Sequence, residues 1–353
     1  MVKRPLVSVL MAVHNGGEYL KPAIDSVLAQ TLGDFEFVIV EDCSTDDSFF
    51  VLASYGDSRL RIVRNDQNLG LTKSLNVGLE LARGRYVARM DADDICVENR
   101  LERQVRHLES GGISLTCSNV FQIDAAGNQT GQTFRAYDRA SILWHLMFDG
   151  YMFHPTLMWN REEVKDSVGG YDERFVTAQD FDFTWRVATA LPVGGLEEPL
   201  LYYRMHGENI TSKKRSSQRE LALGESKKRI REMLGPNFLT DYELDLLRKV
   251  WSWELSEEWE EERFEELVGY YLQLWRNFLE KHRQTAWEVR SAGLKLSSGD
   301  DAAKLSAYYL VRKNMGGFWK MSKVTTGQLG IPNRFFLEAL QRRLQARKAR
   351  TNS

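Results

Sequence analysis

The stretch LVSVLMAVHNGG, residues 6–17, decides the fold class of this chain. From Leu6 to Val13 it is almost continuously apolar, and the turn-forming residues HNGG end the run. Apolar residues then recur at helical spacing, at Leu20, Ile24, Val27 and Leu28. A buried strand, a turn and an amphipathic helix make a βα unit, which is the building block of a parallel sheet covered on both faces.

The same alternation continues along the chain. Strands are predicted at 35–42, 60–65 and 85–91, with helices at 48–55 and 72–82. The following part is more mixed, with strand-like runs at 112–120, 154–160 and 199–206 and a helix at 178–190. The expected fold is therefore α/β, with a mixed, Rossmann-like sheet flanked by helices. In such sheets, ligands bind at the carboxyl ends of the strands, near a switch in strand order.

Beyond Ser216 the strand signal disappears and helix formers dominate. The polar, basic segment at 207–218 separates the two kinds of sequence. We therefore predict an α/β domain at 1–215 and an all-helical C-terminal domain at 216–353.

Composition excludes several classes of protein. With 353 residues, 43% of them hydrophobic, the chain can form about two domains with real cores. A net charge of -2, from 47 basic and 49 acidic residues, does not suggest nucleic acid as a partner. The cysteines, Cys43, Cys96 and Cys117, fit neither a disulfide framework nor a zinc site. No apolar run is long enough to span a bilayer or serve as a signal peptide, so a cytoplasmic location is expected.

The stretch YVARMDADDICVENR, residues 86–100, places three carboxylates within four positions. Like charges this close repel one another unless a cation, a helix cap or a proton offsets them. Asp94 is expected to cap a helix whose apolar face starts at Val97. Asp91 and Asp93 follow a strand and can face a bound divalent cation, because Mg²⁺ and Mn²⁺ favour oxygen ligands. An acidic surface turn is the alternative.

Several motifs in the right order resemble the family-2 inverting glycosyltransferases, which have a GT-A type fold. The resemblance covers roughly residues 6–211. It lies in VSVLMAVHNGGEYLKPAIDSVLAQTLGDFEFVIVEDCSTDDS, in NLGLTKSLNVGLELARGRYVARMDADD and in GGYDERFVTAQDFDFTWRV. Three departures stand out, since His14, Cys43 and Gln179 replace the Tyr, the small residue and the Glu that the family often has.

The resemblance implies a role for individual residues. Asp42 would contact the nucleotide base, Lys73 would lie near the same end of the donor, and Asp91 would contact the ribose. Asp93 would bind the metal, Mn²⁺ or Mg²⁺, under the diphosphate, and Asp180 would be the general base. The donor-binding residues expected are Val13, Asn15, Asp42, Lys73, Arg89 and Asp91.

Other residues leave alternatives open. Asp42 could instead start a turn. His206 is expected to contact the metal or the diphosphate, although a lone His is often a structural residue. His154 falls where the family lines the acceptor pocket. Arg89 can pair with the acids or with the diphosphate, and a purely structural ion pair is equally consistent. Of Asp180 and Asp182, both at a helix start, one is expected to be structural.

The resemblance implies an inverting transfer of sugar from a nucleotide-diphosphate donor to a glycan or lipid-linked glycan, in bacterial polysaccharide assembly. UDP is the preferred nucleotide and dTDP the alternative. The basic amphipathic segment at 333–353 predicts peripheral contact with the inner face of the plasma membrane, against a docking helix or oligomer contact. A non-catalytic sugar-nucleotide-binding scaffold remains a second hypothesis. A sugar nucleotidyltransferase is a third, although its basic, glycine-rich loop is missing after the first strand.

Overall fold

The computed structural model describes residues 4–206 and 215–252, together with the helical residues 269–271, 273–274, 277–278 and 280–281. The chain separates into two compact units, one comprising Met1–Leu146 and Gly150–Ala222 and the other Met147–Asp149 and Leu223–Ser353. The predicted division into domains at 1–215 and 216–353 remains a proposal. The predicted amphipathic segment at 333–353 lies outside the described residues.

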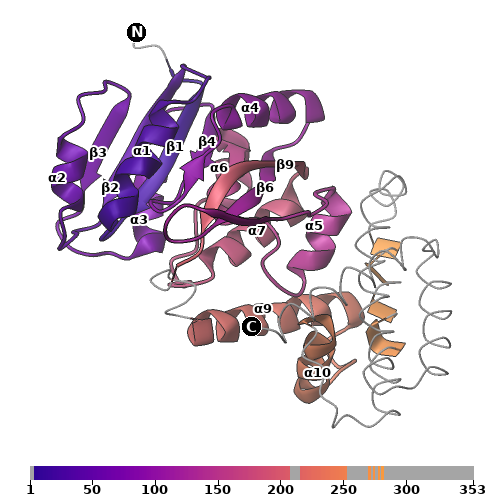
Figure 1. The fold of residues 1–353 in the computed structure, drawn as a ribbon. Coiled ribbons are helices and arrows are strands. Elements are labelled where there is room, and N and C mark those ends of the chain that lie inside the picture. Colours follow the sequence, from indigo (N-terminus) through magenta and orange to yellow (C-terminus); the bar gives the residue numbers. More distant parts are fainter. Residues whose placement is uncertain are drawn as a thin grey trace. The chain divides into compact units, whose positions relative to one another are not determined.

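A nine-stranded mixed sheet forms the centre of the first unit (Figure 1). Its strands follow the order β3-β2-β1-β4-β8-β6-β9-β5, and β7 pairs with β6. The parallel strands β1 to β4 are Val7–Val13, Phe35–Glu41, Leu60–Arg64 and Tyr86–Arg89. The others are β5 (Ile95–Cys96), β6 (Leu115–Ile123), β7 (Gln129–Gln132), β8 (Met158–Asn160) and β9 (Val193–Arg204). Because β8 is antiparallel to both β4 and β6, the sheet is mixed, as expected.

The helices follow the strands much as the sequence predicts. In the first unit they are α1 (Leu20–Leu28), α2 (Ser48–Ala53), α3 (Leu71–Leu81), α4 (Arg100–Gly111), α5 (Arg139–Leu146), α6 (Arg161–Val168) and α7 (Gln179–Ala190), with 3₁₀ turns at Gly17–Tyr19 and His154–Thr156. Later come α9 (Arg215–Leu234) and α10 (Asp241–Ser252). In the described part of the chain beyond 214 the secondary structure is helical. No helix among the described residues is long and apolar enough to cross a membrane.

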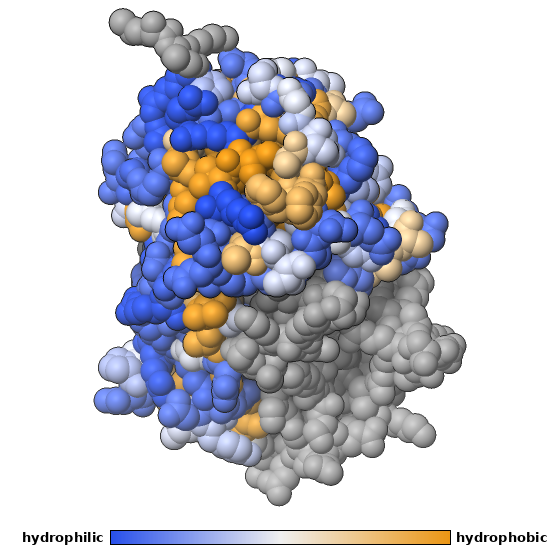
Figure 2. Space-filling model, turned by 90° about the vertical axis from the view of Figure 1, so that its left-hand side faces the viewer, coloured by the Kyte–Doolittle hydropathy of each residue, from blue (hydrophilic) through white to orange (hydrophobic). Residues whose placement is uncertain are grey.

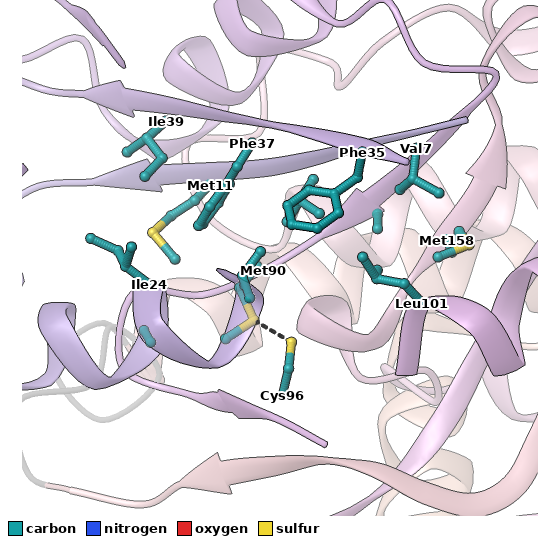
Figure 3. Packing of buried hydrophobic residues seen from close by; sticks show 14 of the residues in the cluster. Val7, Met11, Ile24, Phe35, Phe37, Ile39, Met90, Cys96, Leu101 and Met158 are labelled. Atoms are coloured by element: carbon teal, nitrogen blue, oxygen red, sulfur yellow. Dashed lines mark hydrogen bonds between the residues drawn. The ribbon is translucent and has the colours of Figure 1, made fainter. Parts of the chain in front are cut away.

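Alternation along the strands distributes the core between the two faces of the sheet. Met11 and Met90 point to the face covered by α1 and α4, where Met90 Sδ lies 3.3 Å from Cys96 Sγ (Figure 3). Leu10 points to the opposite face, which α3 covers, and a Cβ added to Gly78 of α3 would lie 2.2 Å from Leu10 Cδ1. The glycine thus lets α3 approach the sheet closely. All seven residues of β1 are buried, as a strand covered on both faces requires.

The edge of the sheet at β3 is less covered than the centre, since its first four residues are half-buried and Arg64 is exposed. On the side of the molecule where α2 and β3 lie, hydrophobic residues form a band between hydrophilic ones (Figure 2). Phe50 of α2 is 70% exposed.

Candidate active site

The candidate site lies where the order of the strands reverses. The chain moves outward from β1 to β2 and β3, and then returns to place β4 on the other side of β1. The loops after β1, β2 and β4 therefore meet at one edge of the sheet, the usual place for a ligand in such folds. The backbone N–H of Asp42 donates to the carbonyl of Val13 at 2.8 Å, which joins the first two of these loops.

Further hydrogen bonds interlock the loops after β1 and β2. The backbone N–H of Asn15 donates to Ser44 Oγ at 3.0 Å, and Asn15 Oδ1 accepts from the N–H of Thr45 at 2.8 Å. Asn15 and Cys43 both have a φ of 55°. This left-handed conformation costs a residue with a Cβ about 1–2 kcal/mol, although Asn tolerates it best. Strained backbone of this kind often accompanies a functional site.

The carboxylate of Asp42 organises the segment that leads into α3. It accepts from Asn65 Nδ2 at 2.7 Å, from the N–H of Leu69 at 2.8 Å and from the N–H of Gly70 at 2.9 Å. Lys73 follows in the first turn of α3, where it is exposed. Asp42 thus positions the start of this helix. Its Oδ2 accepts only one of the three bonds, so it retains capacity for a ligand N–H.

The three acids after β4 come together. One ligand oxygen from each of Asp91, Asp93 and Asp94 lies within 4.8 Å of the others. The expectation that Asp94 caps a helix is wrong, because α4 begins at Arg100, preceded by Asn99. Asp94 is instead buried, and its Oδ1 accepts from the backbone N–H of Arg204 at 2.8 Å. Burial and the neighbouring charges of Asp93 and Asp91 hold the pKa of Asp94 well above its ordinary value.

A guanidinium and an imidazole lie beside this cluster. The guanidinium of Arg89 is fully buried and pairs with Asp91, whose side chain is 30% exposed. Burial raises the pKa of Asp91, against the attraction of Arg89. His206 lies after β9, and its Nε2 is 3.1 Å from Asp93 Oδ2. Its ring centroid lies 4.9 Å from that of Tyr19, which contributes to holding the imidazole beside the acids.

Asp180 lies in the first turn of α7, where it is partly exposed. The residue before the helix, Ala178, has a φ of 59° and turns the chain into it. Burial is the main cause that raises the pKa of Asp91, and the charge of Asp180 adds to it. Asp182 forms an ion pair with Arg186 at 2.8 Å within α7, and its assignment as the structural member of the pair stays a prediction.

The structure adds Tyr171 to the predicted residues. His154 is buried, and its Nε2 lies 2.8 Å from the hydroxyl of Tyr171. Burial, with the nearby charge of Arg89, holds the pKa of His154 well below its ordinary value, so the imidazole is neutral near pH 7. Burial raises the pKa of Tyr171, and Arg89 and Asp180 also act on its hydroxyl. No sequence signal distinguishes Tyr171 from an ordinary core tyrosine.

The acid cluster fits a hard divalent cation. All of its ligand atoms are carboxylate oxygens, the preferred partners of Mg²⁺ and Mn²⁺. Asp94 Oδ2 is buried and has no hydrogen-bond partner among the described residues, an arrangement that a nearby cation would relieve.

Comparisons with known proteins agree with this architecture. The family model of glycosyl transferase family 2 matches residues 8–164. The putative teichuronic acid biosynthesis glycosyltransferase TuaG of Bacillus subtilis is 38% identical over 229 residues, which are 60% of this chain and 83% of TuaG. The Escherichia coli UDP-Glc:alpha-D-GlcNAc-diphosphoundecaprenol beta-1,3-glucosyltransferase WfaP is 31% identical over 116 residues, 33% of this chain and 46% of WfaP.

Among solved structures, S. aureus TarS 1-349 in complex with UDP-GlcNAc has a TM-score of 0.55 at 17% identity, covering 92% of both chains. This likeness supports the expected GT-A type fold. The family assignment rests on the family model and on the 38% identity to TuaG. The chain belongs to glycosyl transferase family 2.

Proposed function

We propose that this protein transfers a sugar from a UDP-sugar, with dTDP-sugar as the alternative, to a hydroxyl of a glycan or lipid-linked glycan. The transfer is a single displacement that inverts the anomeric centre. The observation that carries the proposal is the cluster of Asp91, Asp93 and Asp94 at the strand switch, within electrostatic reach of Asp180. A scaffold that only binds the sugar nucleotide, or a nucleotidyltransferase, would be the alternative function.

Each group has a separate task in this proposal. Val13, Asn15, Asp42 and Lys73 form the donor side, and Asp91 contacts the ribose. Asp93 and His206 hold the divalent cation, which would neutralise charge on the departing diphosphate. Asp180 accepts the proton of the acceptor hydroxyl, a general-base contribution of about 100- to 10,000-fold. Because one displacement completes the transfer, no covalent sugar intermediate is needed.

The names of the relatives support the choice of substrates. TarS is solved with UDP-GlcNAc, TuaG is assigned to teichuronic acid biosynthesis, and WfaP uses a diphosphoundecaprenol acceptor. A role in polysaccharide assembly on a lipid carrier is therefore the one we favour. Peripheral contact with the inner face of the plasma membrane through 333–353 belongs to the same proposal.

Calorimetry with UDP, dTDP, GDP and CDP, each with and without Mn²⁺, tests the proposal. We expect metal-dependent binding of UDP to the wild type and loss of the metal effect in Asp93→Asn. Asp57→Asn is a matched control. Asp57 lies just before the start of β3, at the end of the strands away from the candidate site, and it pairs with Arg59. Absence of nucleotide binding in the wild type would overturn the proposal. Binding without transfer of any sugar would favour the scaffold.

A further inference from the structure

Arg89 is the last residue of β4, and its side chain is completely buried. Its neighbour Met90 points to the face of the sheet covered by α1 and α4 (Figure 3). By alternation Arg89 points to the other face, the side to which Leu10 and Val87 also point. An arginine therefore occupies a position at which a covered strand ordinarily has an apolar residue.

The guanidinium is incompletely satisfied in this position. Nη1 pairs with Asp91, whereas Nε and Nη2 have no hydrogen-bond partner among the described residues. A buried charge with unpaired N–H groups opposes folding, and replacing both members of a buried ion pair by apolar residues of similar volume is often neutral or stabilising, although removing one member alone is costly. The Arg89–Asp91 pair as a whole is therefore weak evidence for a purely stabilising role.

The groups around Arg89 belong to the candidate site. Asp91, on the donor side, pairs with it directly. The hydroxyl of Tyr171 experiences the charges of Arg89 and Asp180, and it is hydrogen-bonded to His154. Because His154 is neutral, Arg89 is the positive charge within this set. Arg89, Tyr171 and His154 therefore connect Asp91, the predicted donor contact, with the region that the charge of Asp180 reaches.

We propose that Arg89 is a positioning residue for the transfer: its buried guanidinium holds Asp91 in place and, with Tyr171 and His154, forms a rigid support beneath Asp91 and Asp180. The inference rests on the proposed function. It assigns Arg89 to the support of the site instead of to the diphosphate, because the side chain is not exposed. It also assigns His154 to the support of the site instead of to the acceptor.

The test replaces Arg89 by Met, which keeps an unbranched side chain and removes the charge. We expect a lower melting temperature than in the wild type, because Asp91 loses its partner. We expect turnover at saturating donor to fall about 100-fold, because small displacements of reacting groups have effects of this size. Arg89→Lys, which retains a charge, should recover about 10-fold of this loss. Wild-type turnover in Arg89→Met, or no recovery of turnover in Arg89→Lys, would overturn the inference.

Tyr171→Phe gives an independent test if Arg89→Met does not fold. It removes one hydroxyl and keeps the ring against Phe183, whose centroid is 4.5 Å away. Turnover should fall about 10-fold with the melting temperature retained. Tyr137→Phe is the matched control, a buried tyrosine whose hydroxyl donates to the Ser118 carbonyl at 3.3 Å. Equal turnover in wild type, Arg89→Met and Tyr171→Phe would refute this inference alone, whereas a wild type without nucleotide binding would refute the proposed function.

Discussion

Asn76 and Tyr171 exchange two hydrogen bonds. Asn76 Nδ2 donates to the carbonyl of Tyr171 at 2.9 Å, and Asn76 Oδ1 accepts from the N–H of Tyr171 at 2.9 Å. Thr72 Oγ1 adds a third bond, to the carbonyl of Phe175 at 2.7 Å. A Cβ at Gly170 would lie 2.7 Å from Asn76 Oδ1, so the glycine permits this contact. Helix α3, which carries Lys73, thus holds the loop that leads to Asp180.

Asn76→Ala is expected to weaken both stability and turnover. The two bonds to Tyr171 and a longer one from Asn76 Nδ2 to Glu173 Oε1, at 3.3 Å, are lost, which corresponds to about 2 kcal/mol of unfolding free energy. Release of the loop should lower turnover about 10-fold, because the base is then less well positioned. Urea unfolding and initial rates measure the two effects. Asn128→Ala, in the exposed turn between β6 and β7, is the control, and equal results for the two variants would contradict the role of Asn76.

Asp180→Asn should abolish transfer and preserve donor binding. The amide cannot accept a proton as a base, so turnover should fall about 100- to 10,000-fold. Nucleotide affinity measured by calorimetry should stay within about twofold, since the base acts on the acceptor. Asp182→Asn, which loses the ion pair with Arg186, should cost far less turnover. Undiminished transfer by Asp180→Asn would rule out this residue as the base.

His206→Ala should reduce the effect of Mn²⁺ on nucleotide binding. Its imidazole lies beside Asp93, and loss of a metal ligand or of its partner typically lowers metal affinity about 10- to 100-fold. Titration of Mn²⁺ at fixed UDP measures this affinity, and chelation by EDTA should reduce wild type and variant to the same level. The control is His107→Ala, because His107 Nδ1 lies 2.8 Å from Thr116 Oγ1 in the sheet region. An unchanged Mn²⁺ affinity would remove His206 from the metal site.

Cys43→Gly should stabilise the protein. Cys43 has a φ of 55°, which costs a residue with a Cβ about 1–2 kcal/mol, whereas glycine adopts this conformation without strain. Glycine also has a greater conformational entropy in the unfolded state, which offsets part of this effect. The expected gain in unfolding free energy is therefore about 0.5–1 kcal/mol. Denaturant unfolding measures it. Cys43→Ala keeps the strain and should show no such gain; an equal gain in both variants would assign the effect to the thiol.

Glu36 should make stability depend on pH in the acid range. Burial acts to raise the pKa of Glu36, but hydrogen bonds from Ser8 and Arg83 outweigh it and leave the pKa below the ordinary value of 4.5. A lowered folded-state pKa means that this stabilisation is complete above the unfolded pKa and is lost as the pH falls through the folded one. Relative to Glu36→Gln, the wild type should be about 2 kcal/mol more stable at pH 7. This difference should shrink below about pH 4.5, and a constant difference would contradict the prediction.

Much of the architecture follows from local patterns. The apolar run at 6–13 and the helical spacing after it predict β1 and α1 correctly, because burial of a strand on both faces imposes a pattern on neighbouring residues. The acids at the strand ends, Asp42 and Asp91, also predict one shared edge, since parallel strands end on the same side of a sheet.

Other features depend on residues far apart in the chain. Asp94 looked like a helix cap, yet its partner is the backbone of Arg204 at the end of β9. The pairing of Asn76 with Tyr171 and of Tyr171 with His154 likewise joins separate elements. The sequence alone determined the βα alternation and the placing of acids at strand ends. Only the tertiary structure decided which side chains support those acids, because such contacts form when distant elements pack together.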